Sequence, residues 1–440
     1  MKDNQLKQVW YVMLFVIAFI SGVFFVPDFS ILGYQFKKLN LLADIRNKRP
    51  VLPAKDSIFA SKDSIVAPAQ INRPSQAFIE EFGEDNLRYF FEALRHSKTE
   101  PVRVAFFGDS FIEGDILCGP FRDTLQLIFG GSGVGYMPIT SEVTQFRTSI
   151  RHEFVQWNTF SMIGQKKENA PLGLPGYCFL PAKGNEVEYK PVGKDFVSAK
   201  IFYESDKYSA LSFAVNDLPD KEVDLEFSEK LKQYKLPGSG FNSVKISFPN
   251  IDSLRVYGVA LEDSIGISVD NFAMRSNPGM GLLLVDRERT RQFDSLRNYK
   301  LVVLQYGVNV LSENDSSGYL WYLDKMVGLI KRLKENFGDC GFLLIGVGDR
   351  CSNQDGKIAT MPHVKVMRDI QRRIAQKSKI AFWDMFVAMG GENGIKRYTE
   401  SQPPLAAKDY THLTFRGGRK IAKKLADALL NEKMKYDRKR

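Results

Sequence analysis

The chain has 440 residues, of which 44% are hydrophobic and 25% charged, a balance typical of a globular protein that can bury a core rather than of a disordered one. Lys and Arg outnumber Asp and Glu by 61 to 51, but this surplus is scattered and partly terminal, and no zinc-ligand spacing, Walker loop or aromatic RNA-binding strand accompanies it. The composition therefore argues against a nucleic-acid-binding protein.

The first element is an uncharged apolar run from Val9 to Val26, preceded by Lys2 and Lys7. Its eighteen residues are about the length that crosses the hydrocarbon core of a bilayer. A cleavable signal peptide has a shorter apolar core that ends in small residues. We therefore expect residues 1–27 to be an uncleaved helical anchor in the inner or plasma membrane. The lysines place the N-terminus in the cytoplasm and the rest of the chain outside it, in the periplasm.

Residues 28–75 contain four prolines among Lys, Asp and Ser, and they are expected to form a linker. Apolar residues then recur at helical spacing from Ser75 to Arg95, which predicts a helix. An apolar run from Val102 to Phe107 predicts a buried strand that breaks at Gly108 and leads to Ser110. Because α/β folds place their chemistry at the carboxyl ends of strands, Ser110 is the candidate nucleophile.

Helical periodicity fades between residues 140 and 262. Short runs that alternate between apolar and polar side chains replace it, such as Leu211, Phe213 and Val215. This period of two predicts half-buried antiparallel strands, which we interpret as a β-sandwich inserted between a first segment at 76–139 and a second at 263–440.

Helices and strands alternate again after the insertion, which predicts a parallel sheet covered by helices on both faces. A strand from Leu301 to Gln305 leads to Asn309, and Asp409-Tyr-Thr-His412 precedes the terminal helix. A serine hydroxyl is a poor nucleophile until a base removes its proton, and His412 with Asp409 supplies a base and a group to orient it. Cys340 and Cys351 flank another predicted strand, across which they could pair in an exported protein.

These blocks, in this order, resemble the SGNH hydrolases, also called GDSL esterases. The resemblance implies that Ser110 is the nucleophile, His412 the base and Asp409 the residue that orients it. It also implies that Asn309 donates its amide to the oxyanion, together with the N–H of Ser110. Its motifs cover roughly residues 101–136 and 254–430.

A second oxyanion donor is implied by the family's glycine block. Gly279, in the segment that begins at Asp270, is the best match for this donor, and Gly281 is its rival. The chain departs from the fullest family pattern at Val310, where many members have Asp after the block-three asparagine. This departure leaves the other blocks intact.

The narrower resemblance is to peptidoglycan O-acetylesterases, which carry a β insert similar to a carbohydrate-binding module. Together with the anchor and the insertion indicated by the residues, it implies a three-layer SGNH-type α/β fold in which helices flank a parallel sheet, with an inserted β-sandwich and an N-terminal transmembrane helix. The implied activity is serine-dependent hydrolysis of O-acetyl esters on cell-envelope or polysaccharide sugars, without a cofactor or metal. Two alternatives remain open: an O-acetyltransferase that uses the same site, fed by a membrane acyltransferase partner, and a non-catalytic carbohydrate-binding protein.

Overall fold

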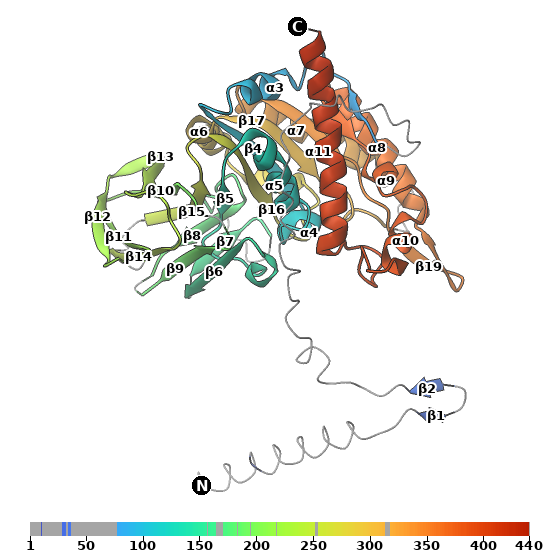
Figure 1. The fold of residues 1–440 in the computed structure, drawn as a ribbon, viewed down its shortest axis with the longest axis horizontal. Helices are drawn as coiled ribbons and strands as arrows, with labels where there is room; N and C mark the ends of the chain where they lie inside the picture. The colour runs from blue at the N-terminus through green and yellow to red at the C-terminus, as the bar shows by residue number, and fades with distance from the viewer. Residues whose placement is uncertain are drawn as a thin grey trace, which may run out of the picture. The chain divides into compact units, whose positions relative to one another are not determined.

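The structure is a computed structural model that describes residue 10, residues 29–31 and 34–36, and residues 77–439 except 156, 164–169, 183, 194, 217, 251–253 and 313–316. The chain divides into two compact units, Met1–Ile71 and Asn72–Arg440. In the first unit, β1 (Phe29–Ile31) and β2 (Tyr34–Phe36) pair antiparallel. Every other element described below belongs to the second unit (Figure 1).

The expected membrane anchor and linker lie almost wholly outside the described residues. Within the part of the chain that is described, no helix is both long enough and apolar enough to cross a bilayer.

A six-stranded sheet carries the candidate site. Its strands, in spatial order, are β16 (Gly266–Ala273), β4 (Pro101–Gly108), β17 (Tyr299–Gln305), β18 (Gly341–Ile345), β21 (Ala381–Trp383) and β3 (Ile79–Glu81). The first five run parallel, and β3 pairs antiparallel with β21 at the edge. Almost every side chain of β4 and β17 is buried, as expected of parallel strands covered on both faces.

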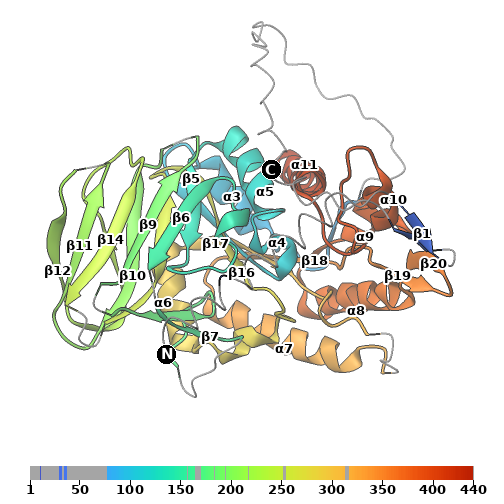
Figure 2. The ribbon, with the colours of Figure 1, turned by 90° about the horizontal axis from the view of Figure 1, so that it is seen from below.

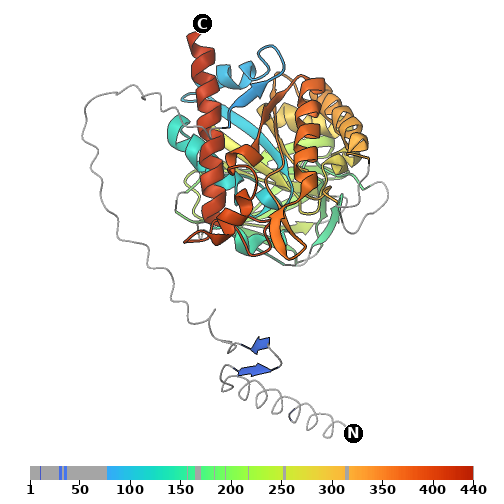
Figure 3. The same ribbon diagram turned by 90° about the vertical axis from the view of Figure 1, so that its right-hand side faces the viewer.

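Two groups of helices cover the faces of this sheet (Figure 2). One group contains α3 (Arg88–Arg95), α5 (Cys118–Phe129) and α11 (Phe415–Arg438), and α11 contacts both of the others. Figure 3 shows α11, in red, as the long helix of this group. The other group contains α6 (Arg287–Arg297), α7 (Leu320–Asn336) and α8 (Pro362–Ser378), in which α7 contacts both neighbours.

The strands between residues 133 and 262 form two antiparallel sheets. The first has the order β13-β10-β15-β8-β7, with β5 also paired to β15, and the second has the order β12-β11-β14-β9-β6. Their bounds are β5 (Gly133–Met137), β6 (Ile150–Val155), β7 (Asn158–Ser161), β8 (Tyr177–Leu180), β9 (Glu186–Pro191), β10 (Ser198–Ser205), β11 (Ser209–Val215), β12 (Lys221–Leu225), β13 (Ser228–Lys235), β14 (Val244–Asn250) and β15 (Leu254–Glu262). The two sheets share a buried cluster that includes Ile201 and Val256 from one and Phe213 and Ile246 from the other.

The fold class expected from the sequence is wrong. It was a three-layer α/β protein with a parallel sheet flanked by helices, an inserted β-sandwich and an N-terminal transmembrane helix. The described chain is a mixed α/β protein with several sheets, most of them antiparallel. The first antiparallel sheet is also buried on both sides, because Phe202, Tyr257 and Ala260 pack into the main core. Alternating side chains show that strands exist, but they do not show how many will pair or which elements they will pack against. The predicted domain boundaries at 140 and 262 stay predictions.

Two smaller expectations are also wrong. The helix predicted from Ser75 to Arg95 is replaced in part by strand β3, and only its second half forms α3. Cys340 and Cys351, like the two other cysteines, are buried free thiols, so the suggested pairing does not form.

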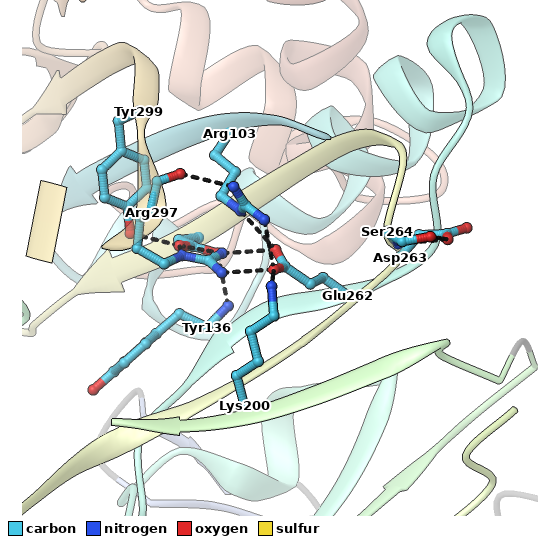
Figure 4. A network of polar contacts seen from close by, with 9 residues as sticks. Arg103, Tyr136, Lys200, Glu262, Asp263, Ser264, Arg297 and Tyr299 are labelled. Atoms are coloured by element: carbon cyan, nitrogen blue, oxygen red, sulfur yellow. Dashed lines mark hydrogen bonds and ion pairs between the residues drawn. The ribbon is translucent and has the colours of Figure 1, made fainter. Parts of the chain in front are cut away.

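A buried ionic network joins the antiparallel strands to the parallel sheet (Figure 4). Glu262, at the end of β15, accepts hydrogen bonds from Arg297 at 2.7 and 2.8 Å, from Arg103 at 3.0 and 3.1 Å and from Lys200 at 3.0 Å. Arg297 also contacts Asp270 of β16 at 2.8 Å. Burial alone would raise the pKa of Glu262, but attraction by these cations holds it well below its usual value.

Candidate active site

Ser110 is the first residue of α4 (Ser110–Glu113), a four-residue helix that follows the carboxyl end of β4. The sharp turn before it requires glycine at position 108, because a Cβ there would lie 2.6 Å from the side chain of Ile112 and 2.9 Å from the carbonyl oxygen of Gln305. Asp109 caps the helix by accepting a hydrogen bond from the N–H of Phe111 at 3.1 Å. The turn thus holds Ser110, which is only partly buried, at the edge of the sheet.

The structure brings His412 and Asp409 to this edge from the other end of the chain. His412 Nε2 lies 3.0 Å from the Oγ of Ser110, and His412 Nδ1 lies 2.6 Å from Oδ2 of Asp409. The other carboxylate oxygen of Asp409 accepts the N–H groups of Thr411 and His412, both at 3.0 Å. These contacts fix the loop directly before α11, which begins at Phe415.

Two opposing effects act on the carboxylate of Asp409. Partial burial raises its pKa, but hydrogen bonds from the side chain and N–H of His412 and from the N–H of Thr411 together hold the pKa below its usual value. An ionised Asp409 accepts the proton of Nδ1, which leaves Nε2 of His412 as an acceptor for the hydroxyl of Ser110. Ser110, His412 and Asp409 therefore form one continuous hydrogen-bonded chain, which is called the relay below.

Asp109 is the most unusual titratable group of the nucleophile turn. Its side chain is fully buried, and its Oδ2 atom has no hydrogen-bond partner among the described residues. Burial raises its pKa from 3.8 to about 7, despite the hydrogen bond from Phe111, which acts in the opposite direction. The carboxyl group is therefore mostly neutral at a pH below about 7.

Asn309 lies in the loop after β17, at the same edge of the sheet, and its side chain is exposed. Gln371 of α8 anchors this loop. It donates to the carbonyl oxygen of Tyr306 at 2.7 Å and accepts from the N–H of Val347 at 2.6 Å. Gly307 has a φ of 121°, and a Cβ there would lie 2.7 Å from Nε2 of Gln371. Glycine is therefore needed where Gln371 clamps this loop.

Gly279 does not offer a free donor in this structure. Its N–H donates to Oδ1 of the buried Asn277 at 2.9 Å, so it is used within its own turn. The rival, Gly281, lies against Met162, whose Sδ would be 2.6 Å from an added Cβ. The oxyanion role of either glycine stays a prediction from the sequence.

Sequence reasoning missed the residues that hold the site in place. Gln371 and Asn277 are both buried and make their contacts through side-chain amides. Glu113, on the same helix as Ser110, accepts a hydrogen bond from Nε of Arg275 at 2.9 Å. The motif spacing carries no signal for these residues, because their partners lie elsewhere in the chain. Among the described residues, no group of three or more His, Cys, Asp and Glu side chains is arranged to hold a metal ion.

Comparison with known proteins gives a likeness in fold and none in sequence. No model of a known protein family matches the chain, and no curated protein does. A peptidoglycan O-acetylesterase structure superposes with a TM-score of 0.68 at 18% sequence identity, over 81% of this chain and 99% of that one. The two proteins therefore share a fold over most of their length.

Carbohydrate esterases are also among the matching structures. A family two carbohydrate esterase from Clostridium thermocellum, in complex with cellohexaose, matches with a TM-score of 0.27 and 12% identity, over 62% of this chain and 99% of that one. An acetyl xylan esterase matches with a TM-score of 0.29 and 19% identity, over 37% of this chain and 81% of that one. These TM-scores are too low to indicate a common overall fold.

Proposed function

We propose that this chain, which shares its fold with a peptidoglycan O-acetylesterase, is a serine ester hydrolase that removes O-acetyl groups from cell-envelope or polysaccharide sugars. The observation that carries the proposal is the relay from Ser110 through His412 to Asp409, with contacts of 3.0 and 2.6 Å. On unrelated folds, a serine, a histidine and an aspartate that are hydrogen-bonded in this arrangement catalyse acyl transfer. The SGNH-type assignment rests on the sequence blocks that contain these residues.

In the first half of the proposed reaction, Oγ of Ser110 attacks the carbonyl carbon of the ester while Nε2 of His412 takes its proton. Asp409 holds the imidazole in the required tautomer and stabilises the positive charge that develops on it. The N–H of Ser110 and the amide of Asn309 are the proposed donors to the oxyanion. His412 then gives its proton to the sugar oxygen, the carbon–oxygen bond to the sugar breaks, and an acetyl ester forms on Ser110.

In the second half, an acceptor hydroxyl attacks this ester and loses its proton to His412. Water as the acceptor releases acetate and restores Ser110. A sugar hydroxyl as the acceptor produces a new acetylated glycan, so hydrolysis and transfer differ only in this step. Hydrolysis is the reaction we propose, because the protein of similar fold is described as a peptidoglycan O-acetylesterase. The location outside the cytoplasm stays a prediction from the sequence.

The test is to incubate the purified full-length protein with an O-acetylated oligosaccharide, with and without a non-acetylated acceptor glycan. Free acetate and acetylated acceptor are measured separately, and Ser110→Ala serves as the matched inactive variant. Release of acetate that depends on Ser110 supports the hydrolase. Acetyl transfer to the acceptor identifies the transferase instead. Glycan binding without either product identifies a non-catalytic binding protein.

A further inference from the structure

The segment of residues 349–351 contacts two loops of the candidate site. It follows β18, so it lies at the same edge of the parallel sheet as Ser110 and Asn309. The buried carboxylate of Asp349 accepts hydrogen bonds from Oγ1 of Thr360 at 2.8 Å and from the N–H of Ile395 at 2.9 Å. These contacts fix the point at which the segment enters the site.

The peptide group between Arg350 and Cys351 is held at both ends. Its carbonyl oxygen accepts the N–H of Met361 at 2.9 Å, and its N–H donates to the carbonyl oxygen of Tyr410 at 3.1 Å. Because Tyr410 belongs to the loop of His412, the segment is joined to the loop that carries the base of the relay.

The backbone of Tyr410 needs this support. It lies between Asp409 and His412, and its φ of 52° falls in the left-handed region that a bulky side chain rarely adopts. A strained backbone of this kind persists only where the surrounding structure holds it in place. The hydrogen bond from Cys351 therefore helps to keep His412 directed at Ser110.

The side chain of Arg350 contacts the other loop. Its Nη1 atom donates to the carbonyl oxygen of Val308 at 3.4 Å. Val308 is buried and directly precedes Asn309, so this carbonyl belongs to the peptide group that leads into Asn309. The separation is long for a hydrogen bond, but the attraction between a full positive charge and a carbonyl dipole persists at this distance. Arg350 therefore acts on the position of Asn309.

No ion pair explains why an arginine occupies this position. Within the part of the chain that the structure describes, Arg350 pairs with no carboxylate, and the carbonyl of Val308 is the acceptor of its guanidinium. Arg275, near the nucleophile helix, differs in this respect because Glu113 accepts its Nε at 2.9 Å. What Arg350 supplies is a charged donor to the backbone next to Asn309.

We propose that Arg350 is a positioning residue that holds the amide of Asn309 in a fixed place relative to His412, so that the oxyanion donor and the base act on the same ester. This role rests on the proposed function and adds to it the connection between the two loops. The amide of Asn309 acts mainly on the charge of the transition state, so its displacement slows turnover more than it weakens substrate binding.

The first experiment measures kcat and KM of Arg350→Met with p-nitrophenyl acetate. We expect kcat to fall by about tenfold or more, while KM changes by less than about threefold. Arg350→Lys keeps a charged donor and should retain more of the wild-type kcat than Arg350→Met. Arg373→Met, the same change at an exposed position on α8, is the control and should leave both constants unchanged. An unchanged kcat, a rise in KM alone, or equal losses of kcat in the Met and Lys variants of Arg350 overturns the inference.

A double variant shows whether Arg350 acts through Asn309. Asn309→Ala/Arg350→Met should be about as slow as Asn309→Ala alone, because both changes remove the same interaction. Multiplicative losses of kcat overturn the inference. Where Arg350→Met shows no cooperative melt, Arg350→Gln takes its place with the same expected results.

Labelling by a fluorophosphonate separates failure of this role from failure of the proposed function. In that reaction Oγ of Ser110 bonds to phosphorus, fluoride leaves and His412 takes the proton, so the rate depends on the relay and the oxyanion donors but on no sugar ester. Labelling that is about tenfold slower in Arg350→Met, in a protein that cleaves no acetylated sugar, keeps the role of Arg350 and overturns the proposed function. Acetate release that depends on Ser110 but is equally fast in wild type and Arg350→Met overturns the role of Arg350 and keeps the proposed function.

Discussion

At the scale of single residues, Asp109 couples the nucleophile turn to pH. Its pKa is about 7 in the folded protein against 3.8 for an exposed carboxyl, because burial disfavours the charged form. The folded state therefore binds the proton more tightly than the unfolded state. The stabilisation that this gives is fully present below pH 3.8 and is lost as the pH rises to about 7.

The resulting prediction concerns Asp109→Asn, which keeps an oxygen to accept the N–H of Phe111 but cannot ionise. Between pH 5 and pH 8 the unfolding free energy of wild type should fall by roughly 2–3 kcal/mol more than that of the variant. Urea unfolding at several pH values measures this difference. Asp224→Asn, at an exposed position on β12, should follow the wild-type profile. Parallel profiles for wild type and Asp109→Asn would show that Asp109 does not titrate in this range.

Asp409→Asn tests the contact between Asp409 and Nδ1 of His412. The variant cannot hold a negative charge beside Nδ1 of His412, so the imidazole loses its fixed tautomer and its stabilising partner. We expect kcat for p-nitrophenyl acetate to fall by about 10⁴-fold with little change in the melting temperature. Asp427→Asn, which removes only the surface partner of Lys423, is the control. A fall of less than tenfold would contradict the proposed role of Asp409.

Single residues also show how far the sequence could predict the site. Ser110, Asp409 and His412 were found because each lies in a local pattern, a strand that ends at glycine or an Asp-x-x-His loop. Gln371 could not be found, because a polar residue in an amphipathic helix looks like a surface residue until its partners Val347 and Tyr306 are known. The hydrogen bond from the N–H of Gly279 could not be predicted either. Its partner Asn277 is only two residues away, but the turn that joins them has no clear sequence signal.

At the scale of elements, the loop that carries Asn309 depends on helix α8. Gln371 joins the loop after β17 to the loop after β18 through its two hydrogen bonds, so it fixes where Asn309 stands. In the proposed mechanism Gln371 is a positioning residue, because its amide is buried and contacts none of the reacting atoms.

Gln371→Met should therefore lower kcat by about tenfold while KM changes less, because the amide of Asn309 acts mainly in the transition state. Asn309→Ala should lower kcat by roughly 10²–10³-fold. The double variant should be no slower than Asn309→Ala alone, since the two changes remove the same interaction. Gln376→Ala, at an exposed position on α8, is the control. Multiplicative losses in the double variant would show that Gln371 acts independently of Asn309.

Strand pairing marks the limit of sequence reasoning at this scale. The apolar runs of β4 and β17 identified buried strands correctly, since long apolar runs are typical of covered parallel strands. Strand β3 was predicted as helix, because its partner β21 lies about 300 positions later and supplies a ladder that helical spacing cannot reveal.

At the scale of the whole second unit, the network around Glu262 is a buried polar connection between the antiparallel strands and the parallel sheet. Glu262→Gln would leave Arg297 and Arg103 with less compensating charge in a buried site. We expect a loss of about 3–5 kcal/mol in the unfolding free energy, measured by urea unfolding. Glu226→Gln, in an exposed pair with Lys232, should leave the unfolding free energy nearly unchanged. Similar small losses in both variants would mean that the network adds little stability.

The distance of 302 positions between Ser110 and His412 also has a consequence in time. At roughly 5–20 residues per second, a ribosome adds His412 about 15–60 s after Ser110. A nascent chain therefore carries the serine hydroxyl for much of its synthesis without the imidazole that would activate it. In the proposed mechanism, ester cleavage begins only when the segment before α11 has been made and has reached the sheet edge. In that mechanism a chain that ends before His412 lacks the base, so ester cleavage would report chains in which Ser110 and His412 have met.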